Sequence, residues 1–187
     1  MIDSHNRTTY THADGTVQNN AWAKLSRDQI DWYREQVKAL EKLGCHDTTM
    51  VMHTPITAYR DAFNVAFKEG LNSNDISIEE SSNGSCWNDG YKTSFGVKYE
   101  GICCCPGDDG VFDVIKELGS TKHVISGHDH VNNYVIEYEG VKLIYGTKTG
   151  PGCSFNPILN GGTVLSVNSR GVSQVWHEYV DISEYLM

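Results

Sequence analysis

The sequence predicts a mixed α/β fold in which helices and strands are arranged in layers. A strong helical period runs over residues 26–44, and a short buried-strand pattern follows directly at Thr48–His53. Two pairs of short strands around turn residues occupy the later part of the chain. Alternating helices and strands followed by hairpins are typical of layered α/β proteins. With 187 residues, the chain has the length of one domain.

The first half of the chain predicts two helices with a strand between them. Ser26 and Gln29 form a capping box, and Gly44 is suited to end the helix that they begin. The apolar positions of this helix repeat at helical spacing: Ile30, Tyr33, Val37, Leu40 and Leu43. The strand Thr48–His53 comes next, and Ala58–Lys68 is expected to form a second amphipathic helix.

The second half predicts one more helix and several strands. Residues 69–106 are rich in Asn, Ser and Gly and are expected to be irregular. A helix is expected over Val111–Leu118 and a strand over Lys122–Ser126. Two hairpins should follow, Asn133–Tyr138 with Val141–Tyr145 and Thr163–Val167 with Val172–Tyr179.

Composition limits the classes of partner and compartment. The formal net charge is −9, from 15 Lys and Arg against 24 Asp and Glu, which argues against a nucleic-acid-binding or anionic-membrane surface. The longest apolar run, Ile102–Cys105, is far shorter than the roughly 20 residues of a membrane span. The amino end also lacks the layout of a signal peptide, so we expect a cytoplasmic protein.

The six cysteines show no C-x-x-C pair, which predicts reduced thiols rather than a disulfide framework. Cys45 and Cys153 are expected to be small buried residues. The consecutive Cys103–Cys105 is a weak candidate for redox or metal chemistry.

The clearest chemical signal is a set of histidines placed where strands end. Gly127-His128-Asp129-His130 follows one predicted strand, and His53 ends another. The glycine is expected to allow the tight bend that precedes His128. Sites in α/β proteins form at the carboxyl ends of strands, so His53, His128 and His130 are predicted to hold a metal ion with an open position.

The order of these motifs resembles the calcineurin-like metallophosphoesterases, and in particular the branch related to purple acid phosphatases. The resemblance rests on strand–His53-x-Pro-Ile–helix followed by strand–Gly-His-Asp-His–Val-Asn–hairpin. Shorter matching segments are Ile2-Asp3-Ser4, Gln29–Tyr33, Leu143–Gly146 and Thr149-Gly150. The resemblance to this family covers the chain from Ile2 to about Val175 and implies an α/β/β/α sandwich.

The resemblance also implies a reaction and a set of ligands. Family members hydrolyse phosphate esters with a hydroxide that bridges two metal ions, which can be Fe, Mn or Zn. By this resemblance His53 and His128 bind one ion, and His130 binds the other. Asp129 and Asn132 stand where they could orient these ligands.

Three amino-terminal motifs of the family are D-x-H, G-D-x-x-D and G-N-H, and the last two are not matched upstream of His53. Asp3-Ser4-His5 spells the first motif but lacks a strand before it, and Gly107-Asp108-Asp109-Gly110 is better explained as a helix cap. We therefore expect residues 1–187 to be one partial domain, the carboxyl-terminal half of such an enzyme. It should hold at most one ion firmly and be weakly active or inactive alone. The missing amino-terminal half is then a possible partner.

Two alternatives remain open. The chain could be a non-catalytic remnant or partner-binding module with a single metal held by the three histidines. It could also carry a rearranged but complete hydrolase site in which Asp3 and His5 join His53, His128 and His130.

Overall fold

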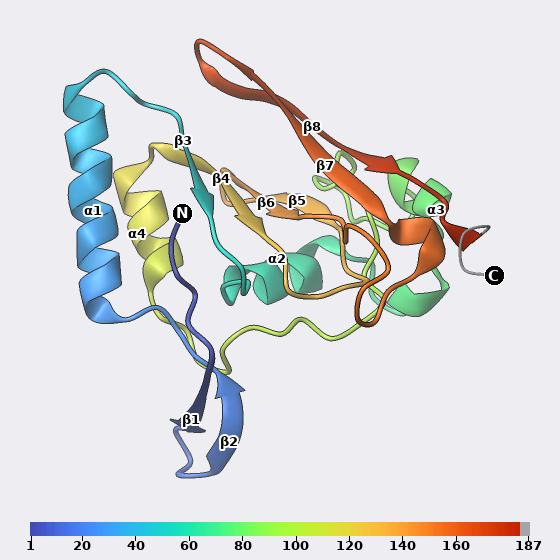
Figure 1. The fold of residues 1–187 in the computed structure, drawn as a ribbon, viewed down its shortest axis with the longest axis horizontal. Coiled ribbons are helices and arrows are strands. Elements are labelled where there is room, and N and C mark those ends of the chain that lie inside the picture. The colour runs from blue at the N-terminus through green and yellow to red at the C-terminus, as the bar shows by residue number, and fades with distance from the viewer. Residues whose placement is uncertain (184–187) are drawn as a thin grey trace.

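A four-stranded sheet organises the fold in the computed structural model, which describes residues 1–183. Its strands are β3 (Thr48–Val51), β4 (Thr121–Ser126), β5 (Val135–Tyr138) and β6 (Val141–Tyr145), in the order β3-β4-β6-β5. β3, β4 and β6 are parallel, and β5 returns antiparallel beside β6 (Figure 1). The prediction of a mixed α/β fold is therefore confirmed.

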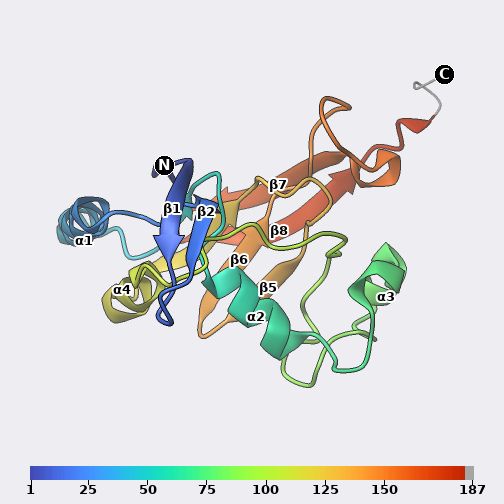
Figure 2. The same ribbon diagram turned by 90° about the horizontal axis from the view of Figure 1, so that it is seen from below.

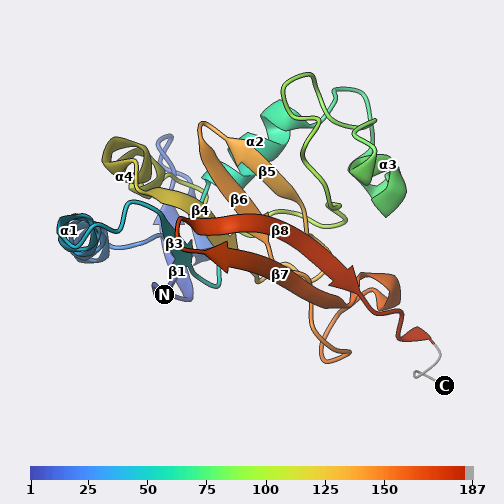
Figure 3. The ribbon, with the colours of Figure 1, turned by 90° about the horizontal axis from the view of Figure 1, so that it is seen from above.

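Helices and a hairpin cover opposite faces of this sheet. Figures 2 and 3 show α2 (Ala58–Ala66) and α4 (Val111–Leu118) on one side, with the hairpin of β7 (Gly161–Asn168) and β8 (Gly171–Tyr179) on the other. α1 (Arg27–Lys42) lies beside α4 at the β3 edge. This layering buries one main core between the helices and the sheet.

Two helix starts follow the local rules that the sequence suggested. At α1, the Gln29 side chain accepts a hydrogen bond from the backbone N–H of Ser26 at 3.0 Å. At α4, Asp108 accepts from the N–H of Gly110 at 3.0 Å, and Asp109 accepts from the N–H of Val111 at 3.0 Å. The N-cap residue of α4 is Gly110, so the helix begins at this Asp-Asp-Gly segment as expected, but neither aspartate is the capping residue itself.

The amino-terminal region contains a hairpin that the sequence pattern did not predict. β1 (Arg7–Thr11) pairs antiparallel with β2 (Val17–Trp22). Most residues of both strands are exposed, so the polar sequence shows no alternation of apolar and polar residues. The turn at Asp14-Gly15, flanked by threonines, was the available signal.

Several boundaries differ from the prediction by a few residues, as element ends commonly do. β3 stops at Val51 rather than His53, and α2 stops at Ala66 rather than Lys68. β5 begins at Val135, since the residues before it pair with the long loop instead. Three short helical segments also form: η1 (Ser73–Asp75), α3 (Ile78–Ser82) and η2 (Pro157–Leu159).

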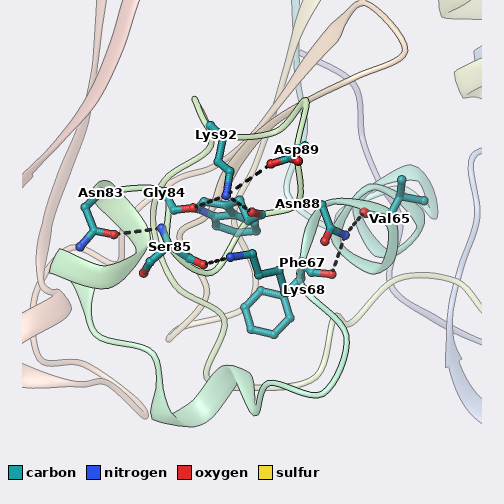
Figure 4. A network of polar contacts seen from close by, with 10 residues as sticks. Val65, Phe67, Lys68, Asn83, Gly84, Ser85, Asn88, Asp89 and Lys92 are labelled. Carbon is teal, nitrogen blue, oxygen red and sulfur yellow. Dashed lines mark hydrogen bonds and ion pairs between the residues drawn. The ribbon is translucent and has the colours of Figure 1, made fainter.

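A buried tryptophan fixes the irregular region 69–106. Polar contacts to the backbone of this region, shown in Figure 4, fix it further. Trp87 is 1% exposed. Lys92 donates to the carbonyl oxygen of Trp87 at 2.7 Å. The Asn88 amide donates to the carbonyl oxygens of Val65 at 2.9 Å and Phe67 at 3.2 Å, which ties the loop to the end of α2.

The expectation that Cys45 and Cys153 are buried is wrong, because both side chains are exposed. Cys45 follows the turn at Gly44, and Cys153 lies in the irregular segment before η2. All six cysteines are free thiols, as predicted. No helix within residues 1–183 is both long and apolar enough to cross a bilayer.

Candidate metal site

Two of the three predicted histidines meet at the carboxyl ends of neighbouring parallel strands. His53 lies two residues beyond β3, and His128 lies two residues beyond β4. Nδ1 of His128 is 3.0 Å from Nε2 of His53, and the ring centroids are 4.9 Å apart. The N–H of Gly127 donates to the carbonyl oxygen of His53 at 3.0 Å. The parallel pairing of β3 and β4 is what brings these rings together.

The tight bend after β4 occurs at His128 itself, where φ is +76°. The φ of Gly127 does not lie in this left-handed range, and a Cβ built on Gly127 would lie 4.0 Å from Nδ1 of His53. The expectation that the glycine makes the bend possible is therefore wrong. A non-glycine residue in this left-handed conformation is uncommon and frequently marks a functional position.

The environment of His128 favours its neutral form. Burial lowers the pKa of this imidazole, and the nearby His53 and Arg7 act in the same direction against the opposing charge of Asp129. The neutral ring keeps a lone pair for a metal ion at neutral pH. The protonation state of His128 thus suits coordination.

His130 is directed to a different neighbour. Its Nδ1 is 2.7 Å from the carbonyl oxygen of Ser154 and 3.0 Å from the Ser154 hydroxyl. Within residues 1–183, the set of potential ligands that converge on one point does not include this ring. The assignment of His130 as a ligand stays a prediction.

Asp129 points into the interior at the same strand end. The residue is 4% exposed, and its Oδ2 accepts hydrogen bonds from the Tyr145 hydroxyl at 2.5 Å and the backbone N–H of Cys103 at 3.1 Å. Its Oδ1 is buried and has no hydrogen-bond partner among residues 1–183. Such an unsatisfied carboxylate oxygen is costly, and a cation can satisfy it.

Asn132 holds the long loop in place. The residue is 1% exposed, and its Oδ1 accepts from the backbone N–H groups of Tyr99 and Glu100, both at 3.1 Å. Glu100 in return accepts from the N–H of Val131 at 2.8 Å. These contacts fix the loop segment that leads to Cys103 beside the strand end.

Cys103 belongs to the cysteine run that the sequence marked as a weak candidate for redox or metal chemistry. Its Sγ, one nitrogen of His128 and one carboxylate oxygen of Asp129 all lie within 4.8 Å of one another. Burial raises the pKa of the Cys103 thiol to about 11, with the Asp129 carboxylate adding to the effect. The cysteine run was visible in the sequence, but the loop path that brings Cys103 to Asp129 was not.

An open hollow of about 570 Å³ gives access to the histidine pair. Its lining residues are Asp3, His5, Asn6, Trp22, His53, Thr54 and His128. The Trp22 ring meets His128 edge-on with 4.0 Å between centroids, and the guanidinium of Arg7 lies 3.3 Å from the centre of that Trp22 ring. The β1–β2 hairpin therefore supplies one wall of the hollow and a positive charge.

The donor set fits one metal ion. Among residues 1–183, a single group of three potential ligand side chains converges: Cys103, His128 and Asp129. His53, in contact with His128, is a further imidazole at the same place. The described residues do not offer a second converging group, so they do not match a two-ion centre.

Comparison with known proteins gives two partial similarities. The chain is 42% identical over 55 residues to "Probable inactive purple acid phosphatase 14" of Arabidopsis thaliana, covering 29% of this chain and 14% of that protein. It is 39% identical over 51 residues to "Probable inactive purple acid phosphatase 29" of the same plant, covering 27% of this chain and 13% of that protein. No family model matches the chain, and no solved structure matches it. The matches support a loose relationship to the purple acid phosphatases through a short segment.

Proposed function

We propose that residues 1–187 are a partial calcineurin-like metallophosphoesterase domain, the carboxyl-terminal half of a metal-dependent phosphate-ester hydrolase. The observation that carries the proposal is the 3.0 Å contact between His53 and His128 at the ends of two adjacent parallel strands. In the resemblance, these are the histidines that bind one ion. The two partial similarities to purple acid phosphatases point the same way.

The layers of the fold are compatible with half of an α/β/β/α sandwich. Helices cover one face of the four-stranded sheet, and the two-stranded β7–β8 sheet lies on the other face. Val167 is 68% exposed and Trp176 is 36% exposed on that hairpin. Additional strands beside β7–β8 would complete a second sheet and cover this surface.

We propose that the chain alone holds one ion and is weakly active or inactive. The family resemblance implies two ions of Fe, Mn or Zn, whereas the described donors converge on one point. A bound ion would lower the pKa of a coordinated water and stabilise negative charge on phosphate oxygens. The protein side chains would hold that ion in place. The relatives carry the word "inactive" in their names, which is consistent with low turnover.

A phosphate ester suits the surroundings of the histidine pair. The hollow beside His53 and His128 is open to solvent and walled by Trp22. The positive charge of Arg7 acts on His128, so it also acts on an anion bound there. This arrangement favours a substrate with negative charge.

The test is to purify the chain, measure bound Mn, Fe and Zn, and assay an aryl phosphate. We expect no more than one ion per chain and little or no turnover. His53→Ala and His128→Ala should each weaken metal binding by more than the roughly 10–100-fold caused by losing an outer-shell partner. His46→Ala is the matched control, because this exposed histidine precedes β3 at its opposite end.

Two outcomes would contradict the proposal. If neither histidine variant changes metal binding, the proposed metal site is wrong. If the chain binds two ions and turns over steadily, the assignment as half of an enzyme is wrong. The shared hollow of Asp3, His5, His53 and His128 favours one second candidate, the rearranged hydrolase site. In that case His5→Ala should also lower metal content.

We further propose that the partner is a polypeptide carrying the absent D-x-H, G-D-x-x-D and G-N-H motifs, docking at the outer edge of β3. That edge receives one hydrogen bond from the N–H of Ile2 to the carbonyl oxygen of Val51, at 2.9 Å. Trp32, 50% exposed, and Leu40, 39% exposed, lie beside it on α1. Edge strands readily pair with another chain.

Co-expression with such a segment should yield a complex that binds two ions and hydrolyses aryl phosphate. A stable complex that stays inactive would favour the non-catalytic, partner-binding alternative instead. Reading the transcript upstream of the Met1 codon would show whether the motifs are encoded there.

The location that we propose is the cytoplasm, since all six thiols are free and reducing compartments keep thiols in that state. The net charge of −9 agrees with a protein that does not bind nucleic acid or anionic membranes.

A further inference from the structure

The cluster beside His128 contains donors that the histidine pattern does not use. Sγ of Cys103, a nitrogen of His128 and a carboxylate oxygen of Asp129 lie within 4.8 Å of one another. Donors that bind one zinc ion tetrahedrally at about 2.0–2.3 Å are about 3.3–3.8 Å apart. The separations of the three atoms therefore have to shorten by up to about 1.5 Å for all of them to reach coordination distance.

The burial and hydrogen bonding of the Asp129 carboxylate are a second, independent indication that a cation binds here. The side chain is buried, and Oδ2 is occupied by the Tyr145 hydroxyl and the N–H of Cys103. Oδ1 is also buried, but the part of the chain that the structure describes gives it no hydrogen-bond partner. A buried carboxylate held at one oxygen and unpaired at the other is suited to binding a cation through the unpaired oxygen.

The position of Cys103 is fixed before any ion binds. Its N–H donates to Asp129, and the preceding loop is held by the two hydrogen bonds to Oδ1 of Asn132. The hydrogen bond from the thiol to the carbonyl oxygen of Gly101 is long, at 3.8 Å. A weak contact of this kind is easily given up, so the sulfur is available as a donor.

We propose that the ion of this site is bound by the thiolate of Cys103 and the carboxylate of Asp129 together with the imidazole of His128. The inference rests on the proposed metal site and specifies its ligands. On binding, the Cys103 thiol loses its proton to solvent and its sulfur forms a bond to the metal. A set of one sulfur, one nitrogen and one oxygen favours Zn²⁺ or Co²⁺ over Mg²⁺ or Mn²⁺. These three donors leave a fourth tetrahedral position, beside which the imidazole of His53 lies in contact with His128.

The test uses Co²⁺ as a spectroscopic probe in the full chain, with the exposed Cys45 and Cys153 replaced by serine. Cobalt should produce a thiolate-to-metal charge-transfer band in the near ultraviolet, and Zn²⁺ should remove it by displacement while Mg²⁺ does not. Cys103→Ser should abolish the band and weaken Zn²⁺ binding by at least about tenfold. Cys104→Ser is the matched control, since this neighbouring thiol is buried and lies outside the cluster.

The outcomes separate this inference from the proposed function. If the band persists in Cys103→Ser, or if Cys104→Ser also removes it, the assignment of Cys103 is wrong, while a loss of metal in His128→Ala still supports the proposed site. If the chain binds neither Co²⁺ nor Zn²⁺, the ligand set proposed here fails, and if it also binds neither Mn nor Fe, the proposed function fails with it. Proton release on Zn²⁺ binding and circular dichroism of the metal-free variants complete the test, because serine at position 103 should leave the fold unchanged and reduce the protons released.

Discussion

Replacing Gly96 with alanine is expected to lower the free energy of unfolding by about 2–5 kcal/mol. Gly96 has φ of +85°, which costs a residue with a side chain about 1–2 kcal/mol. A Cβ at this position would lie 2.3 Å from the carbonyl oxygen of Asn133 and 2.7 Å from Cα of Tyr134. Both neighbours are backbone atoms and cannot rotate away, so overpacking adds about 1–3 kcal/mol.

A second glycine of the same loop separates the two causes. Gly90 has φ of +90° but no atom within 4 Å of a Cβ built on it. Gly90→Ala should therefore lose the conformational term alone, about 1–2 kcal/mol. Urea unfolding followed by circular dichroism measures both variants. Equal losses in the two would show that the contact with Asn133 carries no energy and would contradict this prediction.

The effect of Gly96→Ala should reach the metal site as well. The next residue pairs with Asn133 in both directions, because the N–H of Val97 donates to the Asn133 side chain at 2.8 Å and the N–H of Asn133 donates to the Val97 carbonyl oxygen at 2.9 Å. Moving Gly96 away from Asn133 strains this pair and the segment that continues to Cys103. We therefore expect weaker Co²⁺ binding in Gly96→Ala than in Gly90→Ala.

The parts of the fold that local rules govern could be predicted from the sequence. The capping residues at Ser26 and Gln29 and the turn at Glu139-Gly140 act over a few positions, and the elements beside them form where expected. The exposed β1–β2 hairpin could not be found by burial pattern, since its strands bury little. Its stability depends on contacts such as Arg7 on Trp22, which involve both strands.

Part of the candidate site could likewise be predicted from the sequence, and part of it could not. The contact of His53 with His128 was predictable, because both residues follow strands and parallel strands end at one edge of a sheet. The approach of Cys103 to Asp129 depends on the path of a loop of more than thirty residues. That path is set by buried side chains such as Trp87 and Asn132, and their partners are distant in the sequence.

Above about pH 10, the protein is expected to lose stability steeply. Tyr59, Tyr134 and Tyr145 are each fully buried, and burial raises the pKa of all three phenols above the ordinary tyrosine value of about 10. The folded chain therefore keeps these groups neutral at a pH where the unfolded chain ionises them. The stability that these three raised pKa values contribute is complete below about pH 10 and is lost as the pH rises through the folded-state pKa values.

The slope of this loss follows from linkage. Each tyrosine that is neutral when folded and ionised when unfolded lowers the free energy of unfolding by about 1.4 kcal/mol per pH unit, so the three together give about 4 kcal/mol per pH unit. Urea unfolding followed by circular dichroism from about pH 9 to about pH 11 measures it.

Tyr134→Phe isolates the effect of one buried phenol. The variant keeps the ring and loses a hydroxyl that donates to the carbonyl oxygen of Tyr59 at 2.9 Å, which should lower stability at neutral pH by about 1 kcal/mol. Above pH 10 its slope should be smaller than that of the parent by about 1.4 kcal/mol per pH unit. Because every other titrating group is shared, the difference between the two slopes belongs to Tyr134. Parallel curves would mean that this phenol ionises inside the folded protein, and they would contradict the prediction.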